Sequence, residues 1–302
     1  MMNNFPNLND LPKKLRDYFY ITEEFNIYNI DEEEKDSFFC WSNKSEHNCF
    51  FPYKIVSSDS AYSSSHFSFG GILTTERGHK LGLIVNDLLI DLRAKRLTTL
   101  IVRLPPNIYK SIPHEQLSHL MILSKETNLL GLEIFPVLPL DLKTLSKSKR
   151  KYLINDNPDI FWNIEDDLFQ GWKILEENLR LKYGVTPYHS AFDIYRLHKQ
   201  FPGCVEWNVK KLKSQVLGIQ VYFLLENVVH NQYTASSPVG KTLDTIDYLT
   251  GNAITRYKST RQFYDFGKST EKDGSIINFN LLEYKMRWGS IGMQGPILRF
   301  KI

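Results

Sequence analysis

Two short segments in the second half of the sequence carry side chains that suit acid–base chemistry. His230 and Gln232 alternate along a predicted strand over residues 227–235, so we expect both side chains on the same side of that strand. Asp265 ends a second predicted strand over residues 262–266, and α/β proteins hold ligands at strand ends beside a switch in topology. Each residue also has a structural interpretation, because a lone histidine is more often a core or surface residue and an aspartate at a strand end also caps its loop.

The loop after the first of these strands has the composition of an anion site. Residues 236–241 read Ser-Ser-Pro-Val-Gly-Lys and lead into a predicted helix. A helix start presents unpaired backbone N–H groups and the positive end of the helix dipole, which suit a pyrophosphate. Ser-Ser-Pro is equally a good helix cap and turn, so the loop alone favours neither role. The sequence lacks the spacings of a Walker loop, a dinucleotide loop and a covalent-nucleophile motif, and it shows no metal-ligand spacing.

The order strand, glycine-containing loop, helix, strand occurs once in each half of the sequence. In the second half it covers residues 227–266, and in the first half it covers residues 66–104, with an amphipathic helix predicted over 80–92 and a strand over 98–104. The repetition predicts two α/β domains, which we place at residues 1–145 and 146–302. Chance recurrence in an ordinary α/β protein is the alternative.

The stretch between the two repeated units predicts further regular structure. A basic run over residues 143–151 indicates a solvated helix face at a domain junction rather than a phosphate contact. Apolar spacing predicts a long helix over 161–183 and a second helix over 191–201. Two strands are expected after it, near residues 205–209 and 216–225.

Composition and charge narrow the class of protein. The 302 residues are 42% hydrophobic and carry a formal net charge of +3, so we expect a folded chain without a nucleic-acid partner. The three cysteines show no Cys-x-x-Cys spacing, which predicts neither a disulfide framework nor structural zinc and favours a reducing cytoplasm. The apolar stretches fall short of the roughly 20 residues that a membrane span needs, and the first residues do not resemble a signal peptide. We therefore expect a soluble cytoplasmic protein without membrane insertion.

Several separated motifs, in order along most of the chain, resemble the tandem-domain acyltransferases of the GNAT superfamily, which are related in fold to the FemAB-type aminoacyl transferases. They are Phe69-Gly70-Gly71-Ile72, Arg103-Leu104-Pro105-Pro106, Lys182-Tyr183-Gly184-Val185, His230-Asn231-Gln232-Tyr233, Tyr264-Asp265-Phe266-Gly267 and Tyr284-Lys285-Met286-Arg287-Trp288-Gly289. The resemblance implies an α/β (α+β) fold of two GNAT-like (FemAB/nonribosomal peptidyltransferase-like) domains, each a mixed sheet flanked by helices. We expect one active site per chain, with the acyl-CoA site in the second domain or at the cleft between the two domains. The first domain is expected to lack its own cofactor, because Glu76 in its loop would sit badly beside a pyrophosphate.

The same resemblance implies a bacterial N-acyltransferase with acyl-CoA as co-substrate, either acetyl-CoA or 3-hydroxybutanoyl-CoA, and no metal. The expected acceptor is a nucleotide-linked amino sugar, dTDP-3-amino-3,6-dideoxyhexose, of the kind that enters O-antigen, lipopolysaccharide and capsule. The chain departs from the family pattern in its pyrophosphate loop, residues 237–241, and at Asn278-Phe279, where relatives tend to have Asn-Glu. An aminoacyl-tRNA-dependent transferase and a non-catalytic GNAT-pair scaffold are the alternatives.

The resemblance also implies roles for individual residues. The candidate bases are His230 and Asp265, with Tyr264 as a proton donor to the leaving thiolate, although positioning alone is an alternative to an essential base. A backbone N–H near Ala235, where its strand parts from a neighbour, is expected to stabilise the oxyanion. Residues expected to bind the cofactor are Ala235, Ser236, Ser237, Gly240 and Lys241, and those expected to hold sugar or phosphate are His189, Gln232, Glu271, Asn278 and Lys285.

Overall fold

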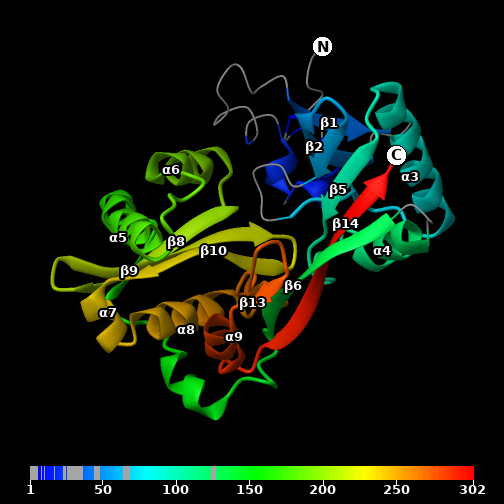
Figure 1. Cartoon of the computed structure of the whole chain (residues 1–302). Helices are drawn as coiled ribbons and strands as arrows, with labels where there is room; N and C mark the ends of the chain where they lie inside the picture. The colour runs from blue at the N-terminus through cyan, green and yellow to red at the C-terminus, as the bar shows by residue number, and fades with distance from the viewer. Residues whose placement is uncertain are drawn as a thin grey trace. The chain divides into compact units, whose positions relative to one another are not determined.

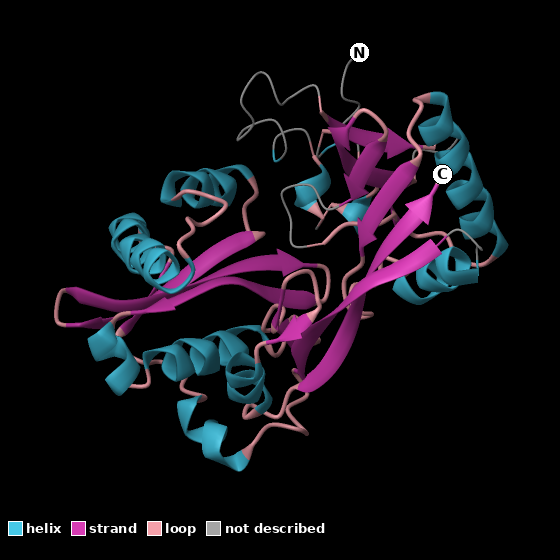
Figure 2. Ribbon diagram, in the orientation of Figure 1, coloured by secondary structure: helices cyan, strands magenta, loops and turns pink. Residues whose placement is uncertain are grey.

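The chain forms two compact units in a computed structural model, which describes residues 6–7, 9, 11–16, 18–22, 25, 37–43, 48–63, 69–123 and 127–302. Unit 1 comprises Met1–Phe135, Lys268–Asn278 and Met293–Ile302, and unit 2 comprises Pro136–Gly267 and Phe279–Gly292. Both units are mixed α/β structures (Figures 1 and 2). Residues 66–68 of the first expected strand lie outside the described part of the chain.

Unit 1 is built on a sheet with the strand order β1-β2-β3-β5-β14-β6. Its strands are β1 (Phe38–Ser42), β2 (Cys49–Ser57), β3 (Ser60–Ser63), β4 (Leu73–Thr74), β5 (Thr99–Arg103), and the parts of β6 (Thr127–Pro139) and β14 (Ile291–Lys301) that belong to this unit. Its helices are η2 (Lys13–Leu15), η3 (Phe19–Ile21), α3 (His79–Ala94) and α4 (His114–Leu123), and a hairpin joins β12 (Thr270–Glu271) to β13 (Ile276–Ile277). The expected helix over 80–92 and strand over 98–104 are confirmed by α3 and β5.

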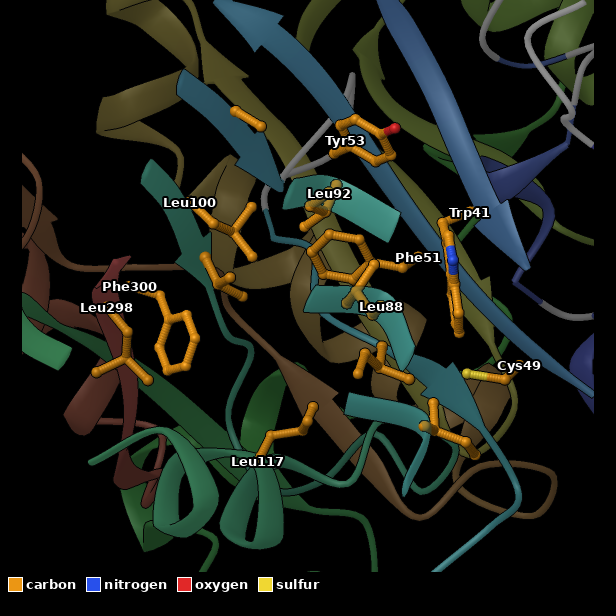
Figure 3. Close-up of a cluster of buried hydrophobic side chains, with 14 of the residues drawn as sticks. Trp41, Cys49, Phe51, Tyr53, Leu88, Leu92, Leu100, Leu117, Leu298 and Phe300 are labelled. Atoms are coloured by element: carbon orange, nitrogen blue, oxygen red, sulfur yellow. The ribbon is translucent and has the colours of Figure 1, made fainter. Parts of the chain in front are cut away.

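The core of unit 1 lies between helix α3 and the sheet. The helix buries Leu81, Ile84, Leu88 and Leu92, and this spacing of three and four residues places them on one face. They pack against strand residues that include Phe51, Leu100, Leu298 and Phe300 (Figure 3). Burying an aliphatic or aromatic side chain of this size contributes about 1.5–3 kcal/mol, so this cluster is a main source of the unit's stability.

Unit 2 is built on a sheet with the strand order β6-β11-β10-β9-β8-β7. Besides residues 136–139 of β6, its strands are β7 (Ile160–Trp162), β8 (Val205–Leu212), β9 (Gln215–Leu225), β10 (Val228–Ser236) and β11 (Phe263–Asp265). Helices α5 (Glu165–Tyr183) and α6 (Ala191–Gln200) cover one face, and α8 (Thr245–Tyr257) covers the other (Figure 1). The remaining helices are η4 (Lys147–Tyr152), α7 (Pro238–Thr242) and α9 (Phe279–Met286).

Strands β10 and β11 run parallel for only a short distance. Their paired residues are Val228 with Phe263, Val229 with Tyr264, and His230 with Asp265. β10 continues to Ser236, paired on its other side with β9 through a register shift between Asn231 and Tyr233. Such a shift marks a β-bulge, in which one strand carries an extra residue and bends. The two parallel strands therefore separate directly after the pair formed by His230 and Asp265.

One expectation from the sequence holds with an exception, and one needs correction. The basic side chains of the run over 143–151 are exposed as expected, apart from Lys149, which is buried in the 3₁₀ helix of residues 147–152. The Lys149 ammonium lies 2.6 Å from the Asp247 carboxylate, which compensates the burial of both charges. The long helix expected over 161–183 begins at Glu165, because the preceding residues form the edge strand β7.

None of the helices in the described part of the chain has the length and apolar character needed to cross a bilayer. Within the same residues, no group of three or more His, Cys, Asp or Glu side chains is placed to hold a metal ion.

Candidate functional site

A buried histidine–aspartate pair lies where β10 and β11 separate. The Nδ1 atom of His230 lies 2.9 Å from Oδ2 of Asp265, and the two side chains are 2% and 0% exposed. The backbone N–H of Gly267 donates to the other carboxylate oxygen, Oδ1, at 2.8 Å. Gly267 has a φ of +71°, a left-handed conformation that favours glycine, and this turn brings its N–H back to the carboxylate. Both oxygens of Asp265 are therefore held in place.

Gln232 contacts the other side of the imidazole ring. Its Oε1 lies 3.0 Å from Nε2 of His230, which confirms the expectation that the two side chains face the same side. A ring protonated on both nitrogens donates to Asp265 and to Gln232 at once. When the ring loses the Nε2 proton, the amide of Gln232 has to turn and donate instead. The surroundings of His230 can thus accommodate both protonation states, as a general base requires.

Lys285 joins the site from helix α9. Its ammonium donates to the carbonyl oxygen of Gly267 at 2.8 Å, on the turn that holds Asp265. Burial lowers the pKa of Lys285 to about 7, and the nearby charge of Asp265 opposes this shift. A lysine with a pKa near neutrality exchanges its proton at physiological pH, which is a property of functional sites more often than of surfaces.

His189 and Tyr233 extend the site on the side of Gln232. The Nδ1 atom of His189 lies 2.7 Å from the hydroxyl of Tyr233, and burial lowers the pKa of His189 to about 4. Burial raises the pKa of Tyr233 to about 12, while a hydrogen bond with the Gln232 side chain opposes the rise. His189 is therefore neutral, and Tyr233 is protonated, over the whole physiological range of pH.

Together these contacts form one continuous row of hydrogen-bonded groups within unit 2. In order, the row comprises His189, Tyr233, Gln232, His230, Asp265, Gly267 and Lys285. The structure thus brings together five side chains that the sequence singles out separately. Tyr233 was not among the candidates, because in a regular strand residues 232 and 233 face opposite sides. The bulge at this position places both in the same row, and the sequence carries no signal for it.

Tyr264 lies on the other side of β11 from Asp265. Its hydroxyl accepts a hydrogen bond from Nδ2 of Asn231 at 3.1 Å, and its ring packs against Phe266 within the hydrophobic cluster of unit 2. Burial raises the pKa of Tyr264. Its expected role as a proton donor to a leaving thiolate stays a prediction.

The expected cofactor loop forms a tight turn into helix α7. The hydroxyl of Ser237 accepts a hydrogen bond from the backbone N–H of Gly240 at 3.0 Å, so this serine caps the helix. Ser236 is buried, and its hydroxyl donates to the carbonyl of Leu217 at 3.4 Å. A side chain at position 240 would collide with the Leu217 carbonyl and with Ser236. The capping role of Ser237 is present, and pyrophosphate binding by this loop, with Ala235 and Lys241, stays a prediction.

Glu271 and Asn278 belong to unit 1 and pair with each other there. The Nδ2 atom of Asn278 donates to Oε1 of Glu271 at 2.8 Å beside the hairpin of β12 and β13. The structure does not place these two residues in the row around His230, and their expected role in holding sugar or phosphate stays a prediction.

Comparisons with known proteins agree with this architecture. FemX has 10% sequence identity to the chain and a TM-score of 0.62, and the match covers 88% of this chain and 89% of that one. L-PGS from Bacillus licheniformis has 12% identity and a TM-score of 0.56, with 88% and 84% covered. The C-terminal domain of a putative lysylphosphatidylglycerol synthetase from Agrobacterium fabrum has 12% identity and a TM-score of 0.57, also with 88% and 84% covered.

No protein-family model and no curated protein matches the sequence. At identities of 10–12%, the likeness to solved structures shows the fold alone. The expected α/β class is confirmed, and the chain has the fold of FemX over most of its length.

Proposed function

We propose that the chain is an N-acyltransferase, which moves an acyl group from an activated carrier to the amine of its acceptor. The observation that carries the proposal is the buried pair of His230 and Asp265 at the point where two parallel strands separate. The pair supplies a base whose orientation is fixed, and the separated strand supplies backbone N–H groups beside it. The FemX-like fold supports the same class of reaction. The sequence motifs, which resemble transferases of the GNAT and FemAB types, support it as well.

The reaction follows from the placement of these groups. The acceptor amine displaces the Gln232 amide from Nε2 of His230, and its nitrogen, in the neutral form, attacks the acyl carbonyl carbon. As the C–N bond forms, the nitrogen gives one proton to Nε2, and Asp265 stabilises the imidazolium that forms. Backbone N–H groups of β10 beyond His230 stabilise the oxyanion. When the bond from the carbonyl carbon to the carrier breaks, the proton passes to the departing atom. A positioned base of this kind contributes about 10²–10⁴-fold to the rate.

The proposed donor is acyl-CoA, with an acetyl or 3-hydroxybutanoyl group, bound in the second half of the chain, residues 146–302. In this proposal the loop of residues 235–241 binds the pyrophosphate, with the Lys241 ammonium as its cation. The proposed acceptor is a nucleotide-linked amino sugar, of which dTDP-3-amino-3,6-dideoxyhexose fits the motif resemblance best. Support for both substrates comes from the sequence motifs.

A second candidate is an aminoacyl-tRNA-dependent transferase of the FemAB type. The likeness to FemX, with a TM-score of 0.62 over 88% of the chain, favours it. The chemistry at His230 and Asp265 is the same for both donors, because each presents an activated acyl carbonyl to an amine. The two candidates differ in the carrier, an oxygen ester on tRNA or a thioester on coenzyme A.

The test is donor-dependent acyl transfer with a panel of acceptors. The purified chain is incubated with acetyl-CoA or 3-hydroxybutanoyl-CoA and with amine-bearing dTDP- and UDP-sugars, and thiol release is measured. Release with one dTDP-3-amino sugar supports the full proposal. Release that depends on aminoacyl-tRNA, followed as loss of the ester, moves the assignment to the second candidate. Absence of transfer from either donor contradicts the proposal and favours a non-catalytic scaffold.

Two variants connect the activity to the site. His230→Gln removes the base and is expected to abolish most of the transfer, while His79→Gln alters an exposed histidine on α3 and is expected to leave transfer unchanged. Equal activity of His230→Gln and the unmodified chain would overturn the assignment of the base, even if the chain proves to be an acyltransferase.

A further inference from the structure

The connection between helices α5 and α6 exposes an unusual run of large apolar side chains. Leu181 is 70% exposed, Tyr183 47%, Val185 52%, Tyr188 58% and Phe192 56%. Five such residues within twelve positions form a patch, which we call the α5–α6 patch. Singly exposed apolar residues are ordinary on protein surfaces, but a contiguous group marks an interaction site.

The patch lies on a part of unit 2 that projects beyond its core. Residues 168–175 of α5 include the buried contacts with the sheet, whereas residues 180–186 are exposed without exception. Gly184, with a φ of +69°, ends the helix and turns the chain toward α6. Helix α6 lies beside α5 and presents Phe192 in its first turn (Figure 1). The apolar side chains are therefore carried on the exposed end of α5 and the start of α6.

Cationic side chains outnumber acidic ones in this segment, which follows the exposed Glu176 and Glu177 on the preceding turn of α5. Residues 180–200 contain four cationic side chains and one acidic side chain, a net charge of +3, which equals the net charge of the whole chain. The single acid, Asp193, is 8% exposed and is engaged in the capping box of α6 with Ser190. The cationic side chains are Arg180, Lys182, Arg196 and Lys199.

We infer that the α5–α6 patch docks the protein onto an anionic lipid bilayer. Aromatic and aliphatic side chains insert at the level of the headgroups, and neighbouring cations bind acidic lipids, a pairing of two weak signals that gives reversible attachment. The excess of cationic side chains beside the apolar ones favours an anionic surface as the partner. The sequence argues against membrane insertion by a spanning segment, and docking through exposed side chains needs no such segment.

The patch adjoins the candidate site through one residue. His189 lies within the α5–α6 connection and is buried, and its ring contacts Tyr233 in the row that leads to His230. Docking would therefore place the start of this row near the lipid surface. The inference itself does not depend on the proposed reaction, because binding to vesicles is measured without any substrate.

The test is cosedimentation of the full chain with lipid vesicles. Vesicles of phosphatidylcholine alone are compared with vesicles of phosphatidylcholine and phosphatidylglycerol in equal parts. We expect binding to the anionic vesicles that weakens as salt rises, because salt screens the cationic side chains. Absence of binding to anionic vesicles, or equal binding to both kinds, would overturn the inference.

Three variants separate this surface from the rest of the molecule. The double variant Tyr188→Ser with Phe192→Ser is expected to bind anionic vesicles about tenfold more weakly or worse. Arg180→Glu with Lys182→Glu is expected to lose at least about tenfold in affinity and much of the salt dependence, since each cation near the surface contributes about fivefold. Phe279→Ser, at a 64% exposed position on α9, is the matched control and should bind as the unmodified chain does. Unchanged binding by both patch variants would contradict the assignment of the surface, and circular dichroism verifies that each variant is folded.

Discussion

The imidazole of His230 and the carboxylate of Asp265 face each other across the last paired position of two parallel strands, with Nδ1 and Oδ2 2.9 Å apart. The ladder fixes the backbone on one side of this position, and on the other side the strands separate. The pair is therefore rigid and lies at the point where the two strands separate. Because Gly267 holds the second oxygen of Asp265, the carboxylate cannot turn away, and the ring keeps one orientation. Fixed orientation of this kind is what the proposed base requires.

The first prediction concerns Asp265, the hydrogen-bond partner of Nδ1 of His230. Asp265→Asn keeps the size of the side chain but removes the negative charge that stabilises an imidazolium at His230. We expect kcat/KM for acyl transfer to fall by about 10²–10⁴-fold, since both the tautomer and the charge balance of the ring change. Steady-state kinetics with the donor and acceptor identified by thiol release measure this loss.

A matched control separates charge from folding in that experiment. Asp156→Asn makes the same change at an exposed position of unit 2 and should leave kcat/KM unchanged. Thermal unfolding of both variants shows how much of each population is folded. A folded Asp265→Asn variant with full activity would mean that transfer depends on positioning alone.

The second prediction concerns the pH dependence of stability. Burial lowers the pKa of Lys285 to about 7, against 10.5 for an ordinary lysine. Between these two values the unfolded chain binds more protons at this site than the folded chain, so the contribution of Lys285 to the free energy of unfolding rises with pH. The expected slope is about 1.4 kcal/mol for each pH unit within that window, and it vanishes below pH 7.

Lys285→Met tests this slope because it keeps the apolar stem and removes the titrating amine. Urea unfolding is measured at pH 6.5 and pH 9, and the free energy of unfolding of the native chain should rise relative to that of the variant between the two values. Lys258→Met, at an exposed position, is the control, and its free energy of unfolding should change with pH as that of the native chain does. If the free energies of unfolding of the native chain and of Lys285→Met change equally with pH, the pKa of the amine is the same in the folded and the unfolded chain.

The sequence predicted the regular elements well and the polar row only in part. Apolar periodicity located α3 within a few residues, because this helix packs one face against the sheet. β5 was located equally well from its run of strand-forming residues. Strand alternation correctly placed His230 and Gln232 on one side. It could not add Tyr233, since a bulge depends on the pairing with β9 and not on the local residue pattern.

Contacts distant in sequence escaped prediction for a related reason. Lys149 belongs to a basic run that is typical of a solvated surface, and its partner Asp247 compensates its burial. The partner lies almost a hundred residues away and follows no local rule. Likewise, Lys285 is an ordinary lysine in its own segment, and its low pKa arises from the elements that enclose it.

The third prediction concerns Tyr233, which we assign as a positioning residue. Tyr233→Phe removes the hydroxyl that contacts His189 and Gln232 while it keeps the ring that packs on Trp172. We expect kcat to fall by about 3–10-fold, because Gln232 loses a hydrogen-bond partner, with a loss of stability of about 1–3 kcal/mol. Kinetics and chemical unfolding measure the two effects separately.

The pH–rate profile tells a positioning role from a structural one. If Tyr233 orients Gln232 against His230, its removal should shift the acidic limb of the profile for kcat/KM, which reports the base of the free enzyme. A variant that is less stable but keeps the profile of the native chain would limit Tyr233 to packing. His189→Gln, which changes the far end of the row, should produce a smaller shift in the same direction.

The last prediction tests whether the turn into α7 has the close packing that the structure gives it. A methyl group at position 240 would collide with the backbone carbonyl of Leu217 and with Ser236, so Gly240→Ala has to displace the loop from the strand. We expect a loss of about 1–3 kcal/mol in the free energy of unfolding, the usual effect of overpacking. Gly82→Ala is the matched control, because a methyl group there meets no atom within 4 Å and a helical alanine stabilises by about 0.5–1 kcal/mol. Urea unfolding of the two variants should therefore shift in opposite directions. If acyl-CoA binds to this loop, Gly240→Ala should also weaken it, whereas Gly82→Ala should not.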